Sequence, residues 1–169
     1  MNGYTENRAS EAHERPGPND LVLTWGASHA MLPLVGRIVN DVMHGHEQLA
    51  QLRPERERLD RQRHTLAWSG RSRRYQLQEE ITAVEKDLRQ AYTELETLGV
   101  AVLHGASGLV GFPTIVNDRR AFFSWRPGEE DVVFWNFAGD PVRHDVPESW
   151  TKAPPAAKAR RSKSRRRQS

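Results

Sequence analysis

Seven apolar side chains recur at alternating intervals of four and three residues near the middle of the chain, and this stripe constrains the fold most. Its members are Leu77, Ile81, Val84, Leu88, Ala91, Leu95 and Leu98. Because an α-helix turns once about every 3.6 residues, the spacing places all seven on one helical face. A lone helix with so long an apolar face is unstable in water. We therefore predict a helix from about residue 71 to residue 98 that is paired with another helix.

The stretch before this helix has a matching period and is the expected partner. Thr24 is a plausible N-cap and Ser28 is a second choice. Pro33 is tolerated only near the first turn of a helix, which slightly favours the later cap. Pro54 should kink or interrupt the helix because it lacks an N–H donor, and the Arg- and Glu-rich residues beyond it are read as a solvated outer end. The turn is expected at residues 68–70, although it could begin a few residues to either side. The apolar face of this first helix comprises Met31, Leu34, Ile38, Val42, Gly45, Leu49 and Leu52.

After Gly99 the period changes from helical to that of short strands. All five phenylalanines and two of the five tryptophans lie within 112–137. Turns are expected at Asn117–Asp118 and at Pro127–Gly128, which separate antiparallel strands. Because the last two strands are apolar on both faces, we expect one face to pack on the helices. The other should be covered by Trp150, by the closing segment or by a second subunit. The expected strands span residues 100–103, 109–111, 114–116, 121–125 and 132–137.

The predicted fold class is therefore α+β, with a long, coiled-coil-like antiparallel helical hairpin followed by a small antiparallel β meander. The 169 residues suffice for one domain plus tails. The domain is expected over 21–150, divided into the hairpin at 22–98 and the meander with its closing segment at 99–150. Polar composition predicts a disordered leader at 1–20 and a disordered basic tail at 151–169.

The net charge of +3 conceals a division between the tail and the rest of the chain. Residues 151–169 hold eight of the 25 basic residues and no acid, so the remainder carries 17 basic and 22 acidic residues. Flexible Lys/Arg segments bind polyphosphates through counterion release. Nucleic-acid binding by this tail is one reading; a solubilising tail, or one that folds back on the acidic body, is the other. The candidate contacts are Lys158, Arg160, Arg161, Lys163, Arg165, Arg166 and Arg167.

Several classes of site are absent from the sequence. There is no cysteine, which excludes disulfides, thiolate zinc sites and cysteine nucleophiles and fits a cytoplasmic location. No apolar run reaches the roughly 18 residues that span a bilayer, and the first 14 residues show no signal-peptide pattern, so no membrane association is expected. His44 and His46 would point about 200° apart on a helix and cannot share a metal ion. Neither a metal nor a cofactor is predicted.

A polar and aromatic set accompanies the meander. Trp125 and Trp135 fall on adjacent predicted strands and should be near neighbours, while Arg126 and Glu129 flank one tight turn. One reading is a small pocket for an anionic or planar ligand. The favoured reading is a turn ion pair above packed core tryptophans. The full candidate set is Arg119, Arg120, Trp125, Arg126, Glu129, Trp135 and Asn136.

Three segments carry a family resemblance. Residues 111–129 read Gly-Phe-Pro-Thr-Ile-Val-Asn-Asp-Arg-Arg-Ala-Phe-Phe-Ser-Trp-Arg-Pro-Gly-Glu, residues 133–136 read Val-Phe-Trp-Asn, and 30–33 read Ala-Met-Leu-Pro. In this order around a helical hairpin, they resemble the bacterial family known as domain of unknown function 2203. The resemblance covers about 22–150 and implies a small cytoplasmic protein whose coiled-coil hairpin carries a β meander. The family's activity is uncharacterised.

The resemblance also marks three departures. Members of the family often have Asp where this chain has Gly111, Cys where it has Ser124, and His where it has Asn136. If those groups form an acid/base or metal site in relatives, this chain has lost its titratable members. An amide exchanges hydrogen bonds but cannot shuttle a proton near neutral pH. The departure counts against catalysis.

Three functional hypotheses follow. The first is a non-enzymatic module that binds a protein partner, with a homodimer expected, through its meander face or helical seam. The second is a nucleic-acid-associated protein that acts through the basic tail. The third is a small-ligand-binding or hydrolytic protein that uses Arg120, Arg126, Glu129 and Asn136.

Overall fold

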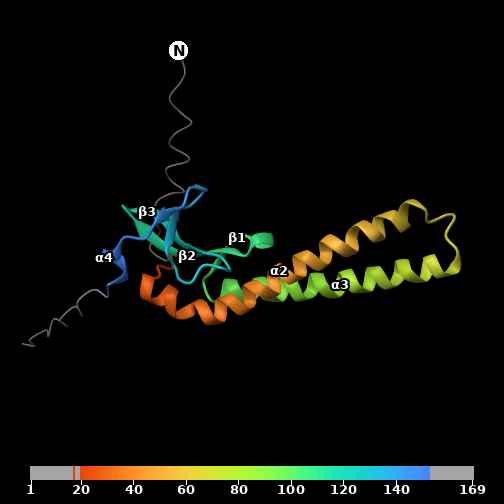
Figure 1. Cartoon of the computed structure of the whole chain (residues 1–169), viewed down its shortest axis with the longest axis horizontal. Helices are drawn as coiled ribbons and strands as arrows, with labels where there is room; N and C mark the ends of the chain where they lie inside the picture. The colour runs from red at the N-terminus through yellow and green to blue at the C-terminus, as the bar shows by residue number, and fades with distance from the viewer. Residues whose placement is uncertain (1–16, 18–19, 153–169) are drawn as a thin grey trace, which may run out of the picture.

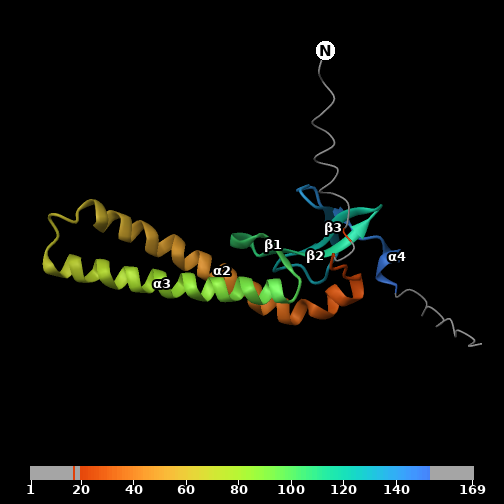
Figure 2. The same cartoon turned by 180° about the vertical axis from the view of Figure 1, so that it is seen from behind.

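Two long antiparallel helices and a five-stranded antiparallel sheet make up the fold. The computed structural model describes residue 17 and residues 20–152, so most of the predicted leader and basic tail lies outside the described residues. The sheet and α4 gather at one end of the hairpin, and the turn between the helices lies at the far end (Figures 1 and 2). The predicted α+β class, with a hairpin before a meander, is confirmed. In chain order the elements are α2 (Trp25–Arg61), α3 (Trp68–Thr97), β1 (Ala101–His104), η1 (Gly105–Ser107), β2 (Leu109–Val116), β3 (Arg119–Trp125), β4 (Phe134–Phe137), β5 (His144–Asp145) and α4 (Glu148–Thr151).

Helix α2 begins after Thr24, the first of the two candidate caps, and it continues past Pro54. The Thr24 hydroxyl accepts a hydrogen bond from the Ala27 N–H at 3.2 Å, as an N-cap does. Pro54 does not interrupt α2, which continues to Arg61. Pro54 is exposed, so water can hydrogen-bond the carbonyl that loses its partner. On either side of it, Arg53 and Glu55 form ion pairs with α3, which hold the helix in place.

The turn between the helices lies earlier than the expected 68–70. Residues 62–67 connect the helices, and α3 already begins at Trp68, with the Arg71 N–H bonded to the Ala67 carbonyl at 3.1 Å. Gly70 lies in this first turn of α3, and the Leu66 side chain packs against it. A Cβ at Gly70 would lie only 3.0 Å from Leu66 Cδ2.

The predicted stripe of α3 packs on α2. Five of its seven members are buried, and Val84 and Leu98 are half-buried. At Gly45 the helices approach so closely that a Cβ would lie 2.7 Å from Leu88 Cγ. Burial of this seam provides the main stabilisation of the hairpin. The facing buried residues of α2 are Val35, Ile38, Val42, Gly45 and Leu49.

Two predicted strands, 109–111 and 114–116, are a single strand, β2, that runs through Pro113. The Pro113 carbonyl accepts a hydrogen bond from the Leu23 N–H at 2.7 Å, on the side away from β3. In an antiparallel strand the N–H of a residue points to the same side as its carbonyl. The missing N–H of Pro113 therefore faces the sheet edge beyond β1, where a proline is tolerated. The short strand β5 has no counterpart in the sequence prediction.

Both predicted turns are present. Asn117 and Asp118 have φ of 52° and 56°, which is the type I′ geometry that a two-residue hairpin requires. At the second turn, the Glu129 N–H bonds the Arg126 carbonyl at 3.2 Å and Gly128 has φ of +99°, as expected for type II.

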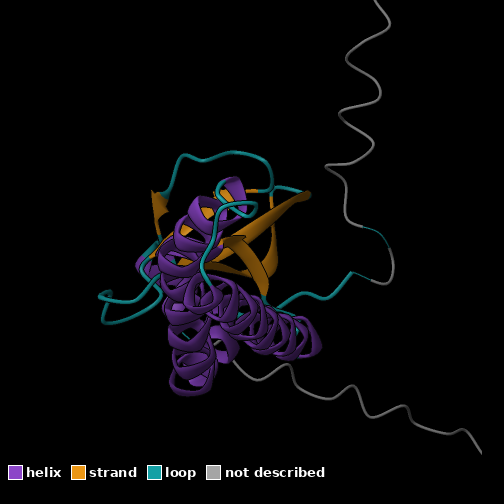
Figure 3. Cartoon of the chain, turned by 90° about the vertical axis from the view of Figure 1, so that its right-hand side faces the viewer, coloured by secondary structure: helices purple, strands orange, loops and turns teal. Residues whose placement is uncertain are grey.

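The sheet packs on the hairpin through one face (Figure 3). Phe112 and Phe123 join Val35 in the common core. Trp150 contacts Phe123 and Trp135, with ring centroids 6.2 and 5.5 Å apart, so it lies on this inner face. The alternative in which Trp150 covers the outer face is therefore wrong, because α4 returns toward α2 and seals the edge of the core. In the described part of the chain, no helix combines the length and apolarity needed to cross a membrane.

Candidate functional site

The densest polar network lies on the outer face of the sheet and centres on Arg143. Its Nη1 and Nη2 donate to the two carboxylate oxygens of Glu129 at 2.6 and 2.9 Å. Its Nε donates to Ser124 Oγ at 3.0 Å, and Nη2 also donates to the Ser124 carbonyl at 2.9 Å. The guanidinium lies 4.3 Å above the centroid of the Phe134 ring. This bidentate pair links the loop before β5 to the end of β3.

The tight turn after β3 completes the network around Glu129. The Arg126 N–H donates to Glu129 Oε2 at 3.1 Å, and Arg126 Nε lies 3.3 Å from Oε1. Trp125 Nε1 donates to the Glu129 carbonyl at 3.0 Å. Burial acts to raise the pKa of Glu129, but the hydrogen bonds and charges of Arg143 and Arg126 together outweigh it and lower the pKa. Glu129 is thus an ionised structural carboxylate, unsuited to donate a proton near neutral pH.

Glu129 should make stability depend on pH below about pH 5. Its folded pKa lies below its ordinary value of 4.5, so its contribution is present above that value and is lost as pH falls through the folded pKa. We expect Glu129→Gln to lower the free energy of unfolding at pH 7, and the gap from the wild type to narrow toward pH 3. Urea unfolding across this range measures the gap. The exposed neighbour variant Glu130→Gln is the control, and a gap that is constant with pH would contradict the assignment.

Trp125 and Trp135 face the core from adjacent strands, but no ring contact between them is described. Trp135 pairs with Phe123 across the sheet, and its described ring contacts are with Phe137, His144 and Trp150. Trp125 is buried two residues farther along β3. Trp125 therefore belongs to the core and to the turn rather than to an aromatic wall.

The other predicted site residues are distributed over both faces. The Arg119 guanidinium lies over the Phe137 ring, 4.2 Å from its centroid. Arg120 binds Asp20 through two hydrogen bonds of 2.7 and 3.1 Å. Among the contacts that the structure describes, Trp125, Arg126 and Glu129 share one network, so the turn ion pair beside a core tryptophan is the arrangement observed.

The three departures from the family pattern share the outer face. Gly111 is the cross-strand partner of Ser124, and Asn136 is the partner of Phe122. A Cβ at Gly111 would lie 2.8 Å from the Phe122 ring, so that ring occupies the space of a larger side chain. Asn136 is 6% exposed; its Nδ2 donates to the carbonyls of Phe137 and Asp140, each at 3.0 Å. These groups form a packed surface with no proton-transfer group among them.

Sequence reasoning did not single out Arg143. It lies fourteen residues after Glu129, beyond the last predicted strand, in a segment that resembles an irregular exit loop. Only the β4–β5 pairing, which places Asp145 beside Phe134, brings it back over the sheet. No local sequence pattern around Arg143 predicts that the chain folds back over the sheet at this residue.

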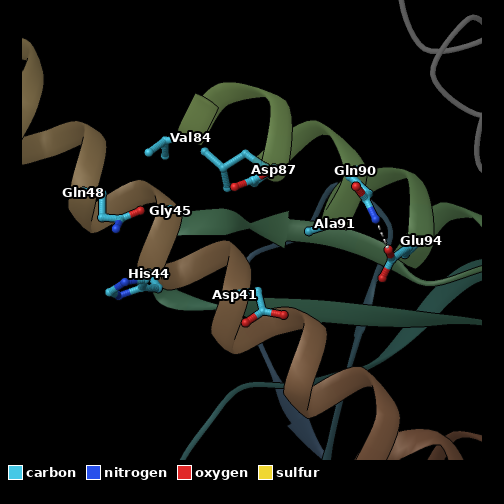
Figure 4. A pocket seen from close by; sticks show the side chains of 10 residues that line it. Asp41, His44, Gly45, Gln48, Val84, Asp87, Gln90, Ala91 and Glu94 are labelled. Atoms are coloured by element: carbon cyan, nitrogen blue, oxygen red, sulfur yellow. Dashed lines mark hydrogen bonds between the residues drawn. The ribbon is translucent and has the colours of Figure 1, made fainter. Parts of the chain in front are cut away.

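The hairpin carries a groove of about 340 Å³ between its helices (Figure 4). Its polar rim includes Asp41, Asp87 and Glu94, and Gln90 Nε2 donates to Glu94 Oε1 at 3.0 Å. Among the described residues, no group of three or more His, Asp or Glu side chains is placed to hold a metal ion. His44 also lines the groove.

A more apolar groove of about 420 Å³ adjoins it toward the sheet, and Gln90 and Glu94 line both grooves. Leu34, Ile38 and Leu98 line this second groove. Leu21 packs against Gly99, the residue after Leu98, since a Cβ at Gly99 would clash with Leu21 Cδ2. Leu34 is 42% exposed and Leu21 is 51% exposed. We call the set Leu21, Leu34, Ile38 and Leu98 the basal apolar patch.

The architecture defines an α+β protein in which a helical hairpin carries a five-stranded meander on its base. Residues 22–143 match the family described as "Uncharacterized conserved protein (DUF2203)", and the chain belongs to that family. This confirms the resemblance drawn from the sequence segments. No curated protein and no solved structure matches the chain significantly.

Proposed function

We propose that this protein is a non-enzymatic, cytoplasmic protein-interaction module that forms a homodimer through the basal apolar patch. The observation that supports the proposal is the exposure of Leu34 and Leu21 beside the half-buried Leu98. Burying a leucine side chain contributes roughly 1.5–3 kcal/mol, so adjacent exposed leucines favour association. The cysteine-free composition is in keeping with a reducing compartment.

A second copy of the chain suits this patch because its rim is self-complementary. Arg37 is exposed one turn after Leu34 on α2, and Glu94 lines the groove from α3. In a two-fold interface the same surface is used twice. Pairing the two hairpins antiparallel brings Arg37 of one subunit toward Glu94 of the partner subunit, around a leucine centre.

The outer-face network supports a binding protein over a hydrolase. Glu129 is fixed by two arginines and held ionised, and Asn136 cannot carry a proton. The hydrolytic hypothesis needs a carboxyl or imidazole free to titrate beside a substrate. Of the residues that this hypothesis uses, Arg126 pairs with Glu129 and Arg120 with Asp20, while Asn136 donates to two backbone carbonyls.

Leu34→Glu should abolish self-association without unfolding the chain. The substituted position is exposed, so the change places a charge in the interface and leaves the seam of the hairpin intact. Sedimentation velocity over a protein concentration series is the measurement, with circular dichroism to show unchanged helix content. The control is Val142→Glu, because Val142 is 55% exposed in the loop between β4 and β5.

We expect the wild type and Val142→Glu to dimerise as concentration rises and Leu34→Glu to stay monomeric. A wild type that stays monomeric at every concentration contradicts the proposed homodimer. Equal dimerisation of Leu34→Glu places the interface elsewhere and also contradicts it.

A further inference from the structure

Basic charge is concentrated at the far end of the hairpin. Residues 53–75 contain eight arginines, no lysine and three acids, which gives this segment a charge of +5. The tail at 151–169 carries +8, so the rest of the chain, with nine basic and 19 acidic residues, carries −10. We call residues 53–75 the hairpin tip. In Figures 1 and 2 the tip projects away from the sheet.

Four of the eight arginines of the tip form ion pairs with a described carboxylate. Glu55 binds Arg73 through two hydrogen bonds of 3.0 Å, and Asp60 binds Arg74 and lies 3.5 Å from Arg56. The hydrogen bond from Arg73 lowers the pKa of Glu55, and that from Arg74 lowers the pKa of Asp60. Arg53 pairs with Glu85 outside the tip. Glu55 and Asp60 are therefore ionised and already engaged.

The other four arginines supply a surplus of positive charge. Arg58, Arg61, Arg63 and Arg71 are all exposed. None of the four has a carboxylate within 4 Å among the residues that the structure describes. No acidic side chain lies in the first turn of α3, so the positive end of that helix adds to the field.

Two aromatic side chains project from the same region. Trp68 is 75% exposed and Tyr75 is 67% exposed, the highest values among the large hydrophobic side chains described. They are seven residues apart on α3, which places them on one side of the helix about 10.5 Å apart, with Arg71 between them. Leu77, which lies two residues after Tyr75, points the opposite way and is fully buried. The aromatic pair therefore faces away from α2.

A solvated helix end would explain the arginines but not the aromatics. Burial of a Trp or Tyr stabilises a folded chain, and here both lie outside the core. A membrane surface is a poorer match, since only two large apolar side chains of the tip, Trp68 and Tyr75, are exposed, and Arg71 and Ser72 lie between them. Cationic side chains beside unpacked rings are instead the combination that binds single-stranded nucleic acid, where phosphates meet arginine and bases stack on rings.

We propose that the hairpin tip is a binding site for single-stranded nucleic acid. Arg58, Arg61, Arg63 and Arg71 contact phosphates, and Trp68 and Tyr75 stack on bases. Duplexes bind less tightly because their bases are already stacked and paired. The site is separate from the basal apolar patch, and it does not depend on the proposed homodimer.

The test uses the full chain with the eight Lys and Arg of residues 151–169 replaced by Gln, so that binding by the tail is removed from every measurement. Fluorescence anisotropy of labelled single-stranded RNA and DNA oligonucleotides is recorded over a salt series. One variant combines Trp68→Ala with Tyr75→Ala, and the other replaces the four unpaired arginines with Gln. The control is Lys86→Gln with Arg89→Gln, which removes exposed charge from α3 outside the tip. Circular dichroism checks that each variant folds.

The aromatic variant is expected to lose roughly 10- to 100-fold in affinity with little change in the salt slope, because stacking is only weakly ionic. The arginine variant should weaken binding and reduce the slope of log affinity against log salt by about 3, at about 0.7 per phosphate contact. The control should retain tip binding. Whichever of RNA and DNA binds more tightly is identified as the natural ligand, and both results support the proposal.

Three results overturn it. The arginine variant could bind as the control does, so that the tip makes no phosphate contact. The aromatic variant could bind as the control does, so that the tip is only a polyanion patch. Anionic phospholipid vesicles could bind the tip while the oligonucleotides do not, so that the partner is a lipid surface.

Discussion

Phe112→Ala is expected to lower the free energy of unfolding by about 4 kcal/mol. Phe112 is fully buried in β2 and lies in the core shared by the sheet and the hairpin. Removing its ring loses the transfer free energy of the ring and leaves a cavity, and such substitutions typically cost 3–5 kcal/mol. Urea unfolding followed by tryptophan fluorescence measures the change.

Ile115→Ala is the matched control on the same strand. Ile115 lies on the outer face and is 36% exposed, so its truncation should cost no more than about 1 kcal/mol. Equal losses at the two positions would mean that the sheet does not present its Phe112 face to the hairpin.

Leu77→Ala is expected to cost about 3 kcal/mol, within the range for buried leucines. Leu77 is fully buried in the half of the hairpin that the sheet does not reach, so only α2 can cover it. Unfolding is followed by circular dichroism at 222 nm, which reports on the helices.

Tyr75→Ala serves as its control, since Tyr75 is 67% exposed two residues earlier. A change within about 0.5 kcal/mol is expected there. If Leu77→Ala were as mild as Tyr75→Ala, the far seam of the hairpin would not be packed.

Local signals in the sequence predicted much of the fold. The period of the stripe identifies α3, and the Thr24 hydroxyl identifies the start of α2. Gly99, with φ of +75°, ends α3, and the Val100 N–H closes back on the Leu95 carbonyl at 2.9 Å. Each of these features depends on residues within one or two turns of one another.

Pro54 does not interrupt α2 and Pro113 does not divide β2, because the tolerance for each proline depends on distant residues. Pro54 stays within α2 because side chains on either side of it bind α3. Pro113 stays within β2 because the side on which it lacks an N–H faces the segment around Leu23 rather than a neighbouring strand. Propensity alone disfavours both positions.

In the candidate site, too, local contacts were predictable from the sequence and long-range contacts were not. The Arg126–Glu129 pair was predictable because one tight turn holds both residues. The clamp by Arg143 depends on strand pairing that no local pattern specifies. At the hairpin tip, alternating charges suggest a neutralised surface, and only the ion-pair geometry shows which arginines remain unpaired.

Both proposed binding surfaces, the basal apolar patch and the hairpin tip, require that α2 and α3 pair within one chain. The chain has no cysteine, so Ala50→Cys and Ala83→Cys, both at exposed positions, allow two spin labels to be placed across the hairpin. With helix axes about 8–10 Å apart, pulsed electron paramagnetic resonance should give one short, narrow distance distribution. That signal should persist when labelled chain is mixed with an excess of unlabelled chain. Loss of the short distance on mixing would show that the helices pair between chains and would contradict the account.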